Sequence, residues 1–151
     1  MMKRVARIVA LLPLVLLILA RPAHAQQREA APLEDFIAQV GRLWARGDAA
    51  ALVRLAPADG RIVLDIGGES GGAVQARHAS AALRALFAER ESVALRPSRI
   101  TVAGGEPLRG FGELAWVSRS RGITDPRPAT LYIGAVWEDG GWRLSELRLL
   151  P

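Results

Sequence analysis

Apolar side chains recur at helical spacing between residues 33 and 44. The positions that share this face are Leu33, Phe36, Ile37, Val40, Leu43 and Trp44. Steps of three and four residues place all of them on one side of an α-helix. Pro32 suits the first turn of that helix and Gly47 its end. Asp48 is a natural N-cap, so the pattern predicts a second, shorter helix over 49–56, which Pro57 ends.

The pattern then changes to alternation. Residues 61–67 are rich in β-branched side chains, with Ile62, Leu64 and Ile66 on one face, which predicts a strand. A glycine-rich loop follows, and a short extended segment over 73–76 leads into a third helix over 78–90. The apolar face of that helix consists of Ala79, Ala82, Leu83, Leu86 and Phe87.

The rest of the chain reads as antiparallel sheet. The first strand of this part has four inward candidates, Val93, Leu95, Ile100 and Val102. Their alternation slips near Pro97, and a β-bulge at that point would absorb the slip. Two longer strands are predicted over 110–122 and 129–138, separated by an irregular loop with Pro126 and Pro128. The last strand begins at Trp142.

The final two strands form a predicted hairpin around Asp139-Gly140, a pair typical of a type I′ turn. With Glu138 opposite Gly141, Trp137 faces Trp142 across the ladder. The inward face is predicted to contain Leu131, Ile133, Ala135, Trp137, Trp142, Leu144, Leu147 and Leu149. Glu146 would break this face, so we expect a bulge near Ser145-Glu146. The tryptophans are interpreted as packing partners, with an aromatic ligand wall as the alternative.

The N-terminus has the layout of a secretory signal peptide. Basic residues at Lys3, Arg4 and Arg7 precede an apolar run over 8–20, and Ala23-His24-Ala25 forms a small-x-small cleavage site. We therefore predict a signal peptide over 1–25, a flexible lead-in over 26–31 and a single domain over 32–151. Export to the periplasm or the medium follows. The apolar run is too short to span a membrane, so no stable insertion is expected after cleavage; an uncleaved anchor is the alternative.

Composition limits the kinds of partner, covalent bond and metal site that the chain can have. The basic excess of the full chain, 20 Lys and Arg against 15 Asp and Glu, lies almost entirely in the predicted leader, which argues against nucleic acid as a partner. The chain has no cysteine, and His78 is the one histidine after the leader. Disulfides, cysteine nucleophiles and histidine-cluster metal sites are thereby excluded, and we predict no metal and no cofactor.

Two stretches carry a resemblance, "FIAQVGRLWARGDAAALVRLAPADGRIVLDI" and "GAVWEDGGWRLSELRL". With the order of elements, they resemble the nuclear transport factor 2-like (cystatin-like, SnoaL-like) superfamily, and most of all a group of small exported bacterial domains of unknown function. That group has Gly-Asp where Gly47-Asp48 stand, and Tyr-Ser where this chain has Val74-Gln75. The resemblance implies an α+β fold, with about three helices packed on a strongly curved, mainly antiparallel sheet that forms a cone.

The superfamily includes ketosteroid isomerases, scytalone dehydratases and SnoaL-like cyclases, whose chemistry needs an acid-base residue inside the cone. The resemblance therefore directs attention to residues of this type. The candidates are Asp65, His78 and Tyr132, and each also has an ordinary surface interpretation. Candidates for ligand contacts are Arg119, Arg121, Tyr132 and Arg143.

Two functions remain open at this point. The first is an exported domain of the cell envelope that binds a small apolar or amphipathic molecule or a partner protein, without an evident catalytic set. The alternative is an isomerase, cyclase or dehydratase that uses Asp65, His78 or Tyr132. A basic surface made of Arg119, Arg121 and Arg127 is a third, weaker interpretation. The sequence favours binding over catalysis, and the resemblance adds a homodimer as an option.

Overall fold

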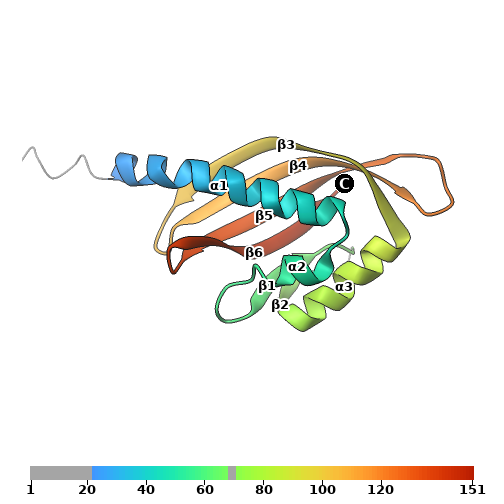
Figure 1. Cartoon of the computed structure of the whole chain (residues 1–151), viewed down its shortest axis with the longest axis horizontal. Coiled ribbons are helices and arrows are strands. Elements are labelled where there is room, and N and C mark those ends of the chain that lie inside the picture. Colours follow the sequence, from blue (N-terminus) through green and yellow to red (C-terminus); the bar gives the residue numbers. More distant parts are fainter. Residues whose placement is uncertain (1–21, 68–70) are drawn as a thin grey trace, which may run out of the picture.

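The computed structural model describes residues 22–67 and 71–151. Residues 1–21, which hold most of the predicted signal peptide, lie outside the described residues. In chain order the elements are α1 (Pro22–Ala45), α2 (Ala49–Val53), β1 (Arg61–Asp65), β2 (Gly72–Gln75), α3 (Ala76–Glu89), β3 (Arg90–Gly104), β4 (Arg109–Ser120), β5 (Arg127–Glu138) and β6 (Gly141–Leu150). Helices in the first half and long strands in the second confirm the predicted α+β fold (Figure 1).

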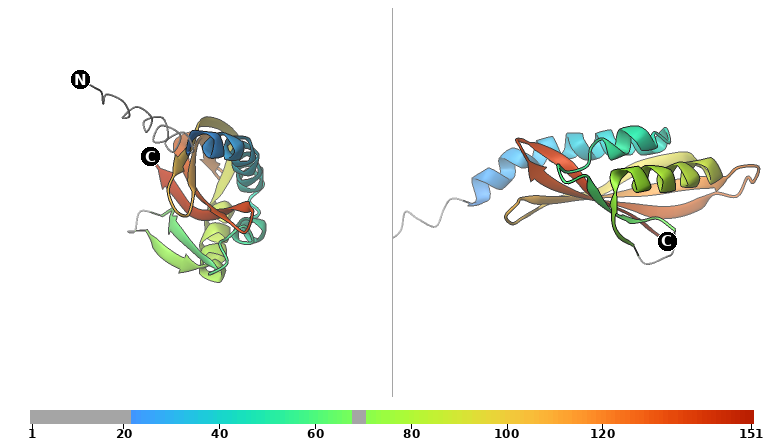
Figure 2. Two further views of the ribbon diagram at one scale, coloured as in Figure 1. Left: turned by 90° about the vertical axis from the view of Figure 1, so that its left-hand side faces the viewer. Right: turned by 90° about the horizontal axis from the view of Figure 1, so that it is seen from below.

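The strands form one sheet in the order β2-β1-β6-β5-β4-β3. Neighbouring strands are antiparallel, except that β1 runs parallel to β6. The four long strands curve along α1, while α2 and α3 lie beside β1 and β2 (Figure 1, Figure 2). We call the face of the sheet that packs against the helices the inner face, and the opposite face the outer face.

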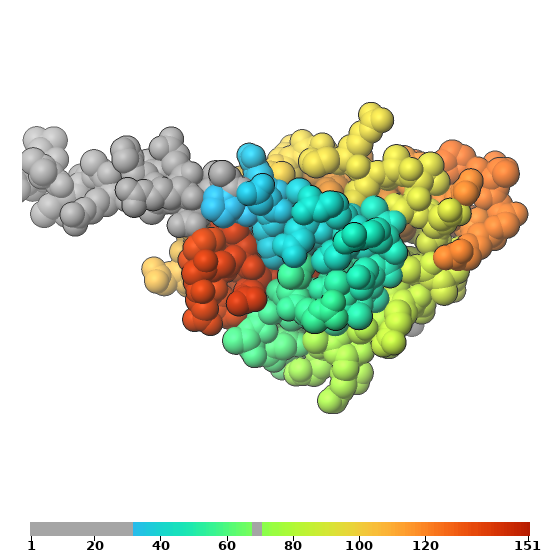
Figure 3. All heavy atoms as spheres, viewed as in Figure 1, coloured from blue at the N-terminus to red at the C-terminus, as the bar shows by residue number. Residues whose placement is uncertain are grey.

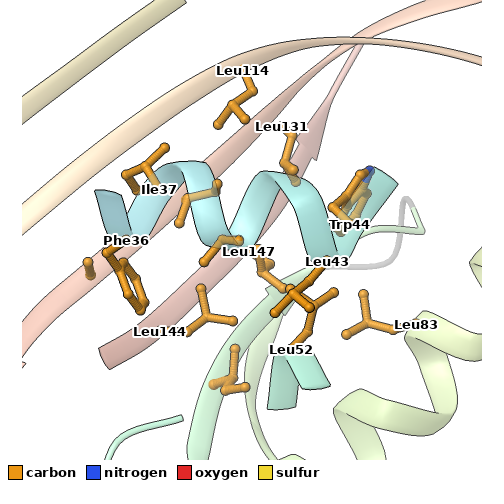
Figure 4. Packing of buried hydrophobic residues seen from close by; sticks show 14 of the residues in the cluster. Phe36, Ile37, Leu43, Trp44, Leu52, Leu83, Leu114, Leu131, Leu144 and Leu147 are labelled. Atoms are coloured by element: carbon orange, nitrogen blue, oxygen red, sulfur yellow. The ribbon is translucent and has the colours of Figure 1, made fainter. Parts of the chain in front are cut away.

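The core fills the space between α1 and the inner face. Its largest fully buried side chains are Trp44, Trp116, Leu33, Ile37, Leu52, Ile62, Leu83, Leu114, Leu131, Ile133, Leu144 and Leu147. Figure 4 shows the labelled members of this cluster gathered around α1 and the strands beneath it. Burying side chains of this size contributes roughly 1.5–3 kcal/mol each, so this cluster is the main source of stability.

The first helix is longer than predicted. α1 begins at Pro22 rather than Pro32, so the lead-in expected over 26–31 is helical. The residues before Pro32 are mostly Ala, Gln, Glu and Arg, which are strong helix formers, and they continue the helix through the proline. None of the described helices is both long enough and apolar enough to cross a membrane.

The junction after α1 follows the prediction. Gly47 has a φ of 68°, and the carboxylate of Asp48 accepts a hydrogen bond from the Ala51 amide at 2.9 Å. This is the expected N-cap, although α2 ends at Val53 rather than at residue 56. A turn closed by the Gly60 amide and the Pro57 carbonyl, 2.9 Å apart, then leads into β1.

Two predicted core positions are wrong. Ala82 of α3 is exposed, and Ser80 takes a buried place on that helix instead. Val93 of β3 is 55% exposed because the β3–β4 register shifts between Ser92 and Ala94, which turns the extra residue outward. The bulge expected near Pro97 is confirmed by a second shift, between Pro97 and Arg99.

The closing hairpin has the predicted register. Glu138 pairs with Gly141 and Trp137 with Trp142, and Asp139 and Gly140 have φ values of 51° and 77°. Gly134 pairs with Glu146 and Ala135 with Leu144, so Ser145 is the extra residue of the expected bulge. In the space-filling view, the hairpin tip (red) lies against α1 (blue) (Figure 3).

Candidate ligand-binding site

Three aromatic rings meet where α1 and α3 end beside β4. The Trp44 ring lies 5.1 Å from the Phe87 ring and 5.3 Å from the Trp116 ring, measured between centroids, and both contacts are edge to face. Gly47 ends α1 just after Trp44, and α3 passes directly into β3 just after Phe87. The chain reversals at these two helix ends therefore bring the rings together. Trp44 and Trp116 are almost completely buried.

Arg90 places a positive charge on this aromatic cluster. It is the first residue of β3 and pairs with Ser120, which directs its side chain to the inner face. Its guanidinium carbon lies 4.6 Å from the centroid of the Trp116 ring, a cation–π contact. Burial, and then the nearby charge of Arg127, lower the pKa of Arg90. The guanidinium of Arg90 is thus partly desolvated and lies near that of Arg127.

Two buried donors in this cluster have no acceptor. They are Nε1 of Trp44 and Nε of Arg90, which find no hydrogen-bond partner within the described part of the chain. Trp116, by contrast, donates from Nε1 to Oγ of Ser92 at 2.8 Å. A buried polar group left unpaired costs about 1–3 kcal/mol, so these two donors lower the stability of this end of the fold.

Arg90 separates two pockets at this end of the molecule. The first, which we call the Arg90 pocket, has a volume of about 280 Å³, and its walls include Trp44, Arg46, Phe87, Arg90, Glu91 and Arg121. The second has a volume of about 410 Å³ and is lined by Arg90, Arg127, Ala129, Leu149 and neighbouring residues. Ligand sites generally span about 300–1,000 Å³, so the second pocket lies within this range and the Arg90 pocket just below it.

Of the predicted ligand contacts, Arg121 reaches the Arg90 pocket. It donates from Nε to the Ala88 carbonyl at 2.9 Å and from Nη2 to the Phe87 carbonyl at 3.3 Å. These bonds satisfy carbonyl groups at the end of α3, so Arg121 also has a structural role. Arg119 instead forms an ion pair with Glu91, with 3.0 Å between Nη2 and Oε2.

Asp65 and Tyr132 lie elsewhere, on the outer face. The register places Asp65 beside Arg148 and Arg148 beside Tyr132, so β6 separates the two candidates. The Tyr132 ring lies 5.6 Å from the Phe111 ring. Burial is the main cause that raises the pKa of Tyr132, and the charge of Glu146 raises it further.

The remaining candidates are also apart from the pocket. His78 is exposed in the first turn of α3, where its Nε2 accepts a hydrogen bond from Nε of Arg77 at 3.4 Å. Arg143 pairs with Val136 on the outer face. The three acid-base candidates therefore do not converge on one site. Within residues 22–67 and 71–151, no cluster of three or more His, Asp or Glu side chains is arranged to hold a metal ion.

Sequence reasoning missed Arg90 and assigned Trp44 only to the core. A signal was present, because Arg90 stands at the helix–strand boundary and shares the parity of Ser92, which faces inward. Trp44 fits the apolar pattern of its helix whether or not its indole N–H has a hydrogen-bond partner, so the pattern could not show that the partner is missing. The unpaired donors became visible only in three dimensions.

No family model matches the sequence, and no curated protein matches it either. Solved structures do match. A ketosteroid isomerase-like protein from Erwinia carotovora atroseptica superimposes with a TM-score of 0.64 at 16% identity, over 80% of this chain and 94% of that one.

Two further solved structures have a similar fold. A DUF4783 family protein from Bacteroides ovatus has a TM-score of 0.58 at 12% identity, over 73% of this chain and 89% of that one. An NTF2-like protein with a cystatin-like fold from Novosphingobium aromaticivorans has a TM-score of 0.58 at 21% identity, over 84% of each chain. At these identities the likeness concerns the fold. The chain therefore has the nuclear transport factor 2-like, cystatin-like fold that its sequence resembles.

Proposed function

We propose that this domain binds a small amphipathic molecule at the Arg90 pocket. The observation that carries the proposal is a pocket that three arginines, Arg46, Arg90 and Arg121, line together with Phe87. The partly buried Phe87 offers apolar surface, and the three arginines offer charged hydrogen-bond donors. The predicted signal peptide places this activity outside the cytoplasm.

The ionisable groups of the pocket favour binding over catalysis. Arg46, Arg90 and Arg121 carry guanidinium groups, which donate hydrogen bonds and do not accept them, so they cannot serve as general bases. Glu91, the one carboxylate among the pocket residues named above, is paired with Arg119. An acid-base reaction of the ketosteroid isomerase type needs a group that gains and loses a proton near neutral pH. An enzyme built on Asp65, His78 or Tyr132 stays the alternative, and it would work at a different place.

Native mass spectrometry tests the proposal. The full chain is expressed and exported in a bacterial host, and the exported protein is sprayed under conditions that retain non-covalent ligands. We expect a species heavier than the polypeptide by the mass of one small molecule. Arg90→Gln should lose that species, because it removes one of the three positive charges that line the pocket.

Arg99→Gln provides the matched control. Arg99 lies on the outer face, where its side chain is 73% exposed, so the substitution removes the same charge without touching the Arg90 pocket. The control should retain the ligand. A ligand retained equally by the two variants, or no ligand in any preparation and no binding of added small molecules, would contradict the proposal.

A further inference from the structure

A further pocket lies where the tip of the β5–β6 hairpin meets α1, two segments that are side by side in Figure 3. We call it the hairpin groove. Its volume of about 520 Å³ falls within the usual range of ligand sites, about 300–1,000 Å³. Trp137 lines it from the hairpin, and Asp35, Gln39 and Arg42 line it from α1. We infer that the hairpin groove binds a saccharide, whose sugar ring stacks on Trp137 and whose hydroxyl groups bond to the three polar side chains.

The aromatic side of the groove is held in place before any ligand arrives. The Trp137 ring is partly exposed, and the Trp142 ring contacts it edge to face with 5.3 Å between centroids. Trp142 is only 6% exposed and therefore mainly supports its neighbour. The C–H groups on one face of a sugar ring form an apolar patch, which matches the flat apolar surface of an indole. Because Trp137 is already fixed by packing, a ligand need not order it on binding.

The polar side of the groove follows from helical spacing. Asp35, Gln39 and Arg42 stand at i, i+4 and i+7 of α1, which places them on one side of the helix. All three are exposed, and within the described residues none has a hydrogen-bond or ion-pair partner. A carboxylate only accepts hydrogen bonds, a guanidinium only donates them, and an amide does both. Sugar hydroxyl groups also do both, so this set of side chains can bond to several hydroxyls of one ring.

The charge of the groove favours a neutral ligand. Asp35 and Arg42 are the charged members among its described lining residues, and their charges cancel. An anion would be repelled by Asp35, and a cation by Arg42. Gly140 and Gly141 at the hairpin tip leave the groove open, since a Cβ atom at either position would have nothing within 4 Å. The groove therefore fits a neutral ring that carries hydroxyl groups around its edge.

Titration with simple sugars tests the inference. The methyl glycosides of glucose, galactose, mannose and N-acetylglucosamine are added to the protein, and sorbitol, an open-chain polyol without a ring face, is the control probe. The readout is the ¹H–¹⁵N spectrum of the indole groups, because the chain has 4 tryptophans and each gives its own signal. We expect at least one glycoside to shift the Trp137 signal, which Trp137→Leu identifies, and to leave those of Trp44 and Trp116 in place. Sorbitol should move none of them.

Asp35→Ala should weaken binding of that glycoside about tenfold, as the loss of one hydrogen bond to a charged group implies. Glu34→Ala is the matched control and should leave the affinity unchanged, because Glu34 is an exposed neighbouring carboxylate that does not line the groove. Thermal unfolding of both variants checks that each is folded.

Three results would overturn the inference. They are a Trp137 signal that no glycoside moves, a signal that sorbitol moves equally, and equal affinities of the Asp35→Ala and Glu34→Ala variants. The proposed function would stand in each case, because the Arg90 pocket and the hairpin groove share no lining residue among those described.

Discussion

Two glycines of β4 let α1 lie directly on the sheet. Gly110 and Gly112 both belong to the inner face, where α1 crosses it. A Cβ atom at Gly110 would lie 2.6 Å from Cδ2 of Leu33, and one at Gly112 would lie 2.8 Å from Cδ1 of Ile37. These side chains of α1 occupy the space that β4 leaves empty. The absence of a side chain on the strand is thus part of the packing between helix and sheet.

Gly112→Ala should lower the free energy of unfolding by about 1–3 kcal/mol, the usual effect of overpacking a filled core. The three nearest atoms to the new methyl group all belong to Ile37, which is fully buried and cannot turn away. Gly72→Ala in β2 is the matched control, because nothing lies within 4 Å of its added Cβ. Urea denaturation of both variants measures the difference. Equal stability of the two would contradict this account of the contact.

Tyr132 gives a spectroscopic test of the outer face. Its pKa lies above the ordinary value because burial disfavours the tyrosinate, and Glu146 adds to the effect. The chain has 1 tyrosine, so the ultraviolet absorbance of tyrosinate reports on this residue alone. We expect a midpoint above the ordinary value of about 10. Glu146→Gln should lower it because a repelling charge is removed. A wild-type midpoint at or below about 10 would contradict the burial.

The direction of the linked change in stability follows from the same shift. The folded protein holds the Tyr132 proton more tightly than the unfolded chain does. The stabilisation that this gives is complete below the unfolded pKa of about 10 and disappears as the pH rises through the folded pKa. Tyr132→Phe should therefore remove that part of the decline in stability at alkaline pH, which urea denaturation at several pH values would measure.

The β5–β6 hairpin combines a tight turn, an aromatic pair and a bulge. The rings of Trp137 and Trp142 lie 5.3 Å apart with an interplanar angle of 80°, an edge-to-face contact. Ser145 is the extra residue in β6, and its bulge lets Leu144 and Leu147 both reach the inner face while Glu146 stays outside. Gly134, opposite Glu146, leaves room for that carboxylate side chain, since a Cβ there would lie 2.7 Å from Cβ of Glu146.

A double-mutant cycle measures the aromatic pair. Trp137→Leu and Trp142→Leu are made singly and together, and the free energies of unfolding are compared. We expect a coupling energy of about 0.5–1.5 kcal/mol, typical of edge-to-face rings. Each single change also removes other contacts, and the cycle subtracts those. The control cycle combines Trp137→Leu with Leu131→Ala. These two residues are not opposite each other, so their effects on the free energy of unfolding should be nearly additive. A Trp137–Trp142 coupling near zero would mean that the rings stabilise the hairpin independently.

On the outer face of the whole molecule, a row of four charged residues and one tyrosine crosses five strands. The register aligns Arg99 of β3, Glu113 of β4, Tyr132 of β5, Arg148 of β6 and Asp65 of β1. A second copy rotated by 180° about the direction of β5 would place Arg99 opposite Asp65 and Glu113 opposite Arg148. The row is therefore complementary to itself, as a two-fold interface requires. The homodimer expected from the resemblance stays a prediction, and this face is where it would form.

A charge swap tests that dimer by sedimentation at several concentrations. Glu113→Arg should weaken dimerisation by about tenfold or more, because it sets two positive side chains against each other. Arg148→Glu should do the same with two negative ones. The double variant restores opposite charges across the interface and should recover the dimer. A monomer at every concentration, or a double variant that adds the two losses, would contradict a dimer through this row.

Local sequence patterns predicted those features of the fold that depend on residues close together in the chain. The Asp48 cap, the Asp139-Gly140 turn, the Trp137–Trp142 pairing and the bulge at Ser145 all follow from residue type and alternation over a few positions. Each is dictated by backbone conformations and side-chain periodicities that act over short distances. The errors occurred where local preference was ambiguous: helix formers before Pro32 extended α1, and a bulge that no proline marked turned Val93 outward.

The candidate site was decided by contacts between distant segments. Trp44, Phe87, Arg90 and Trp116 come from four elements, and no periodicity relates their positions. The parallel pairing of β1 with β6 likewise joins segments from opposite halves of the domain. A sequence shows which side chains are apolar or charged, because those are properties of residues. Whether a buried N–H finds an acceptor depends on which segments of the chain pack around it. Only the folded arrangement of helix ends and strands determines that.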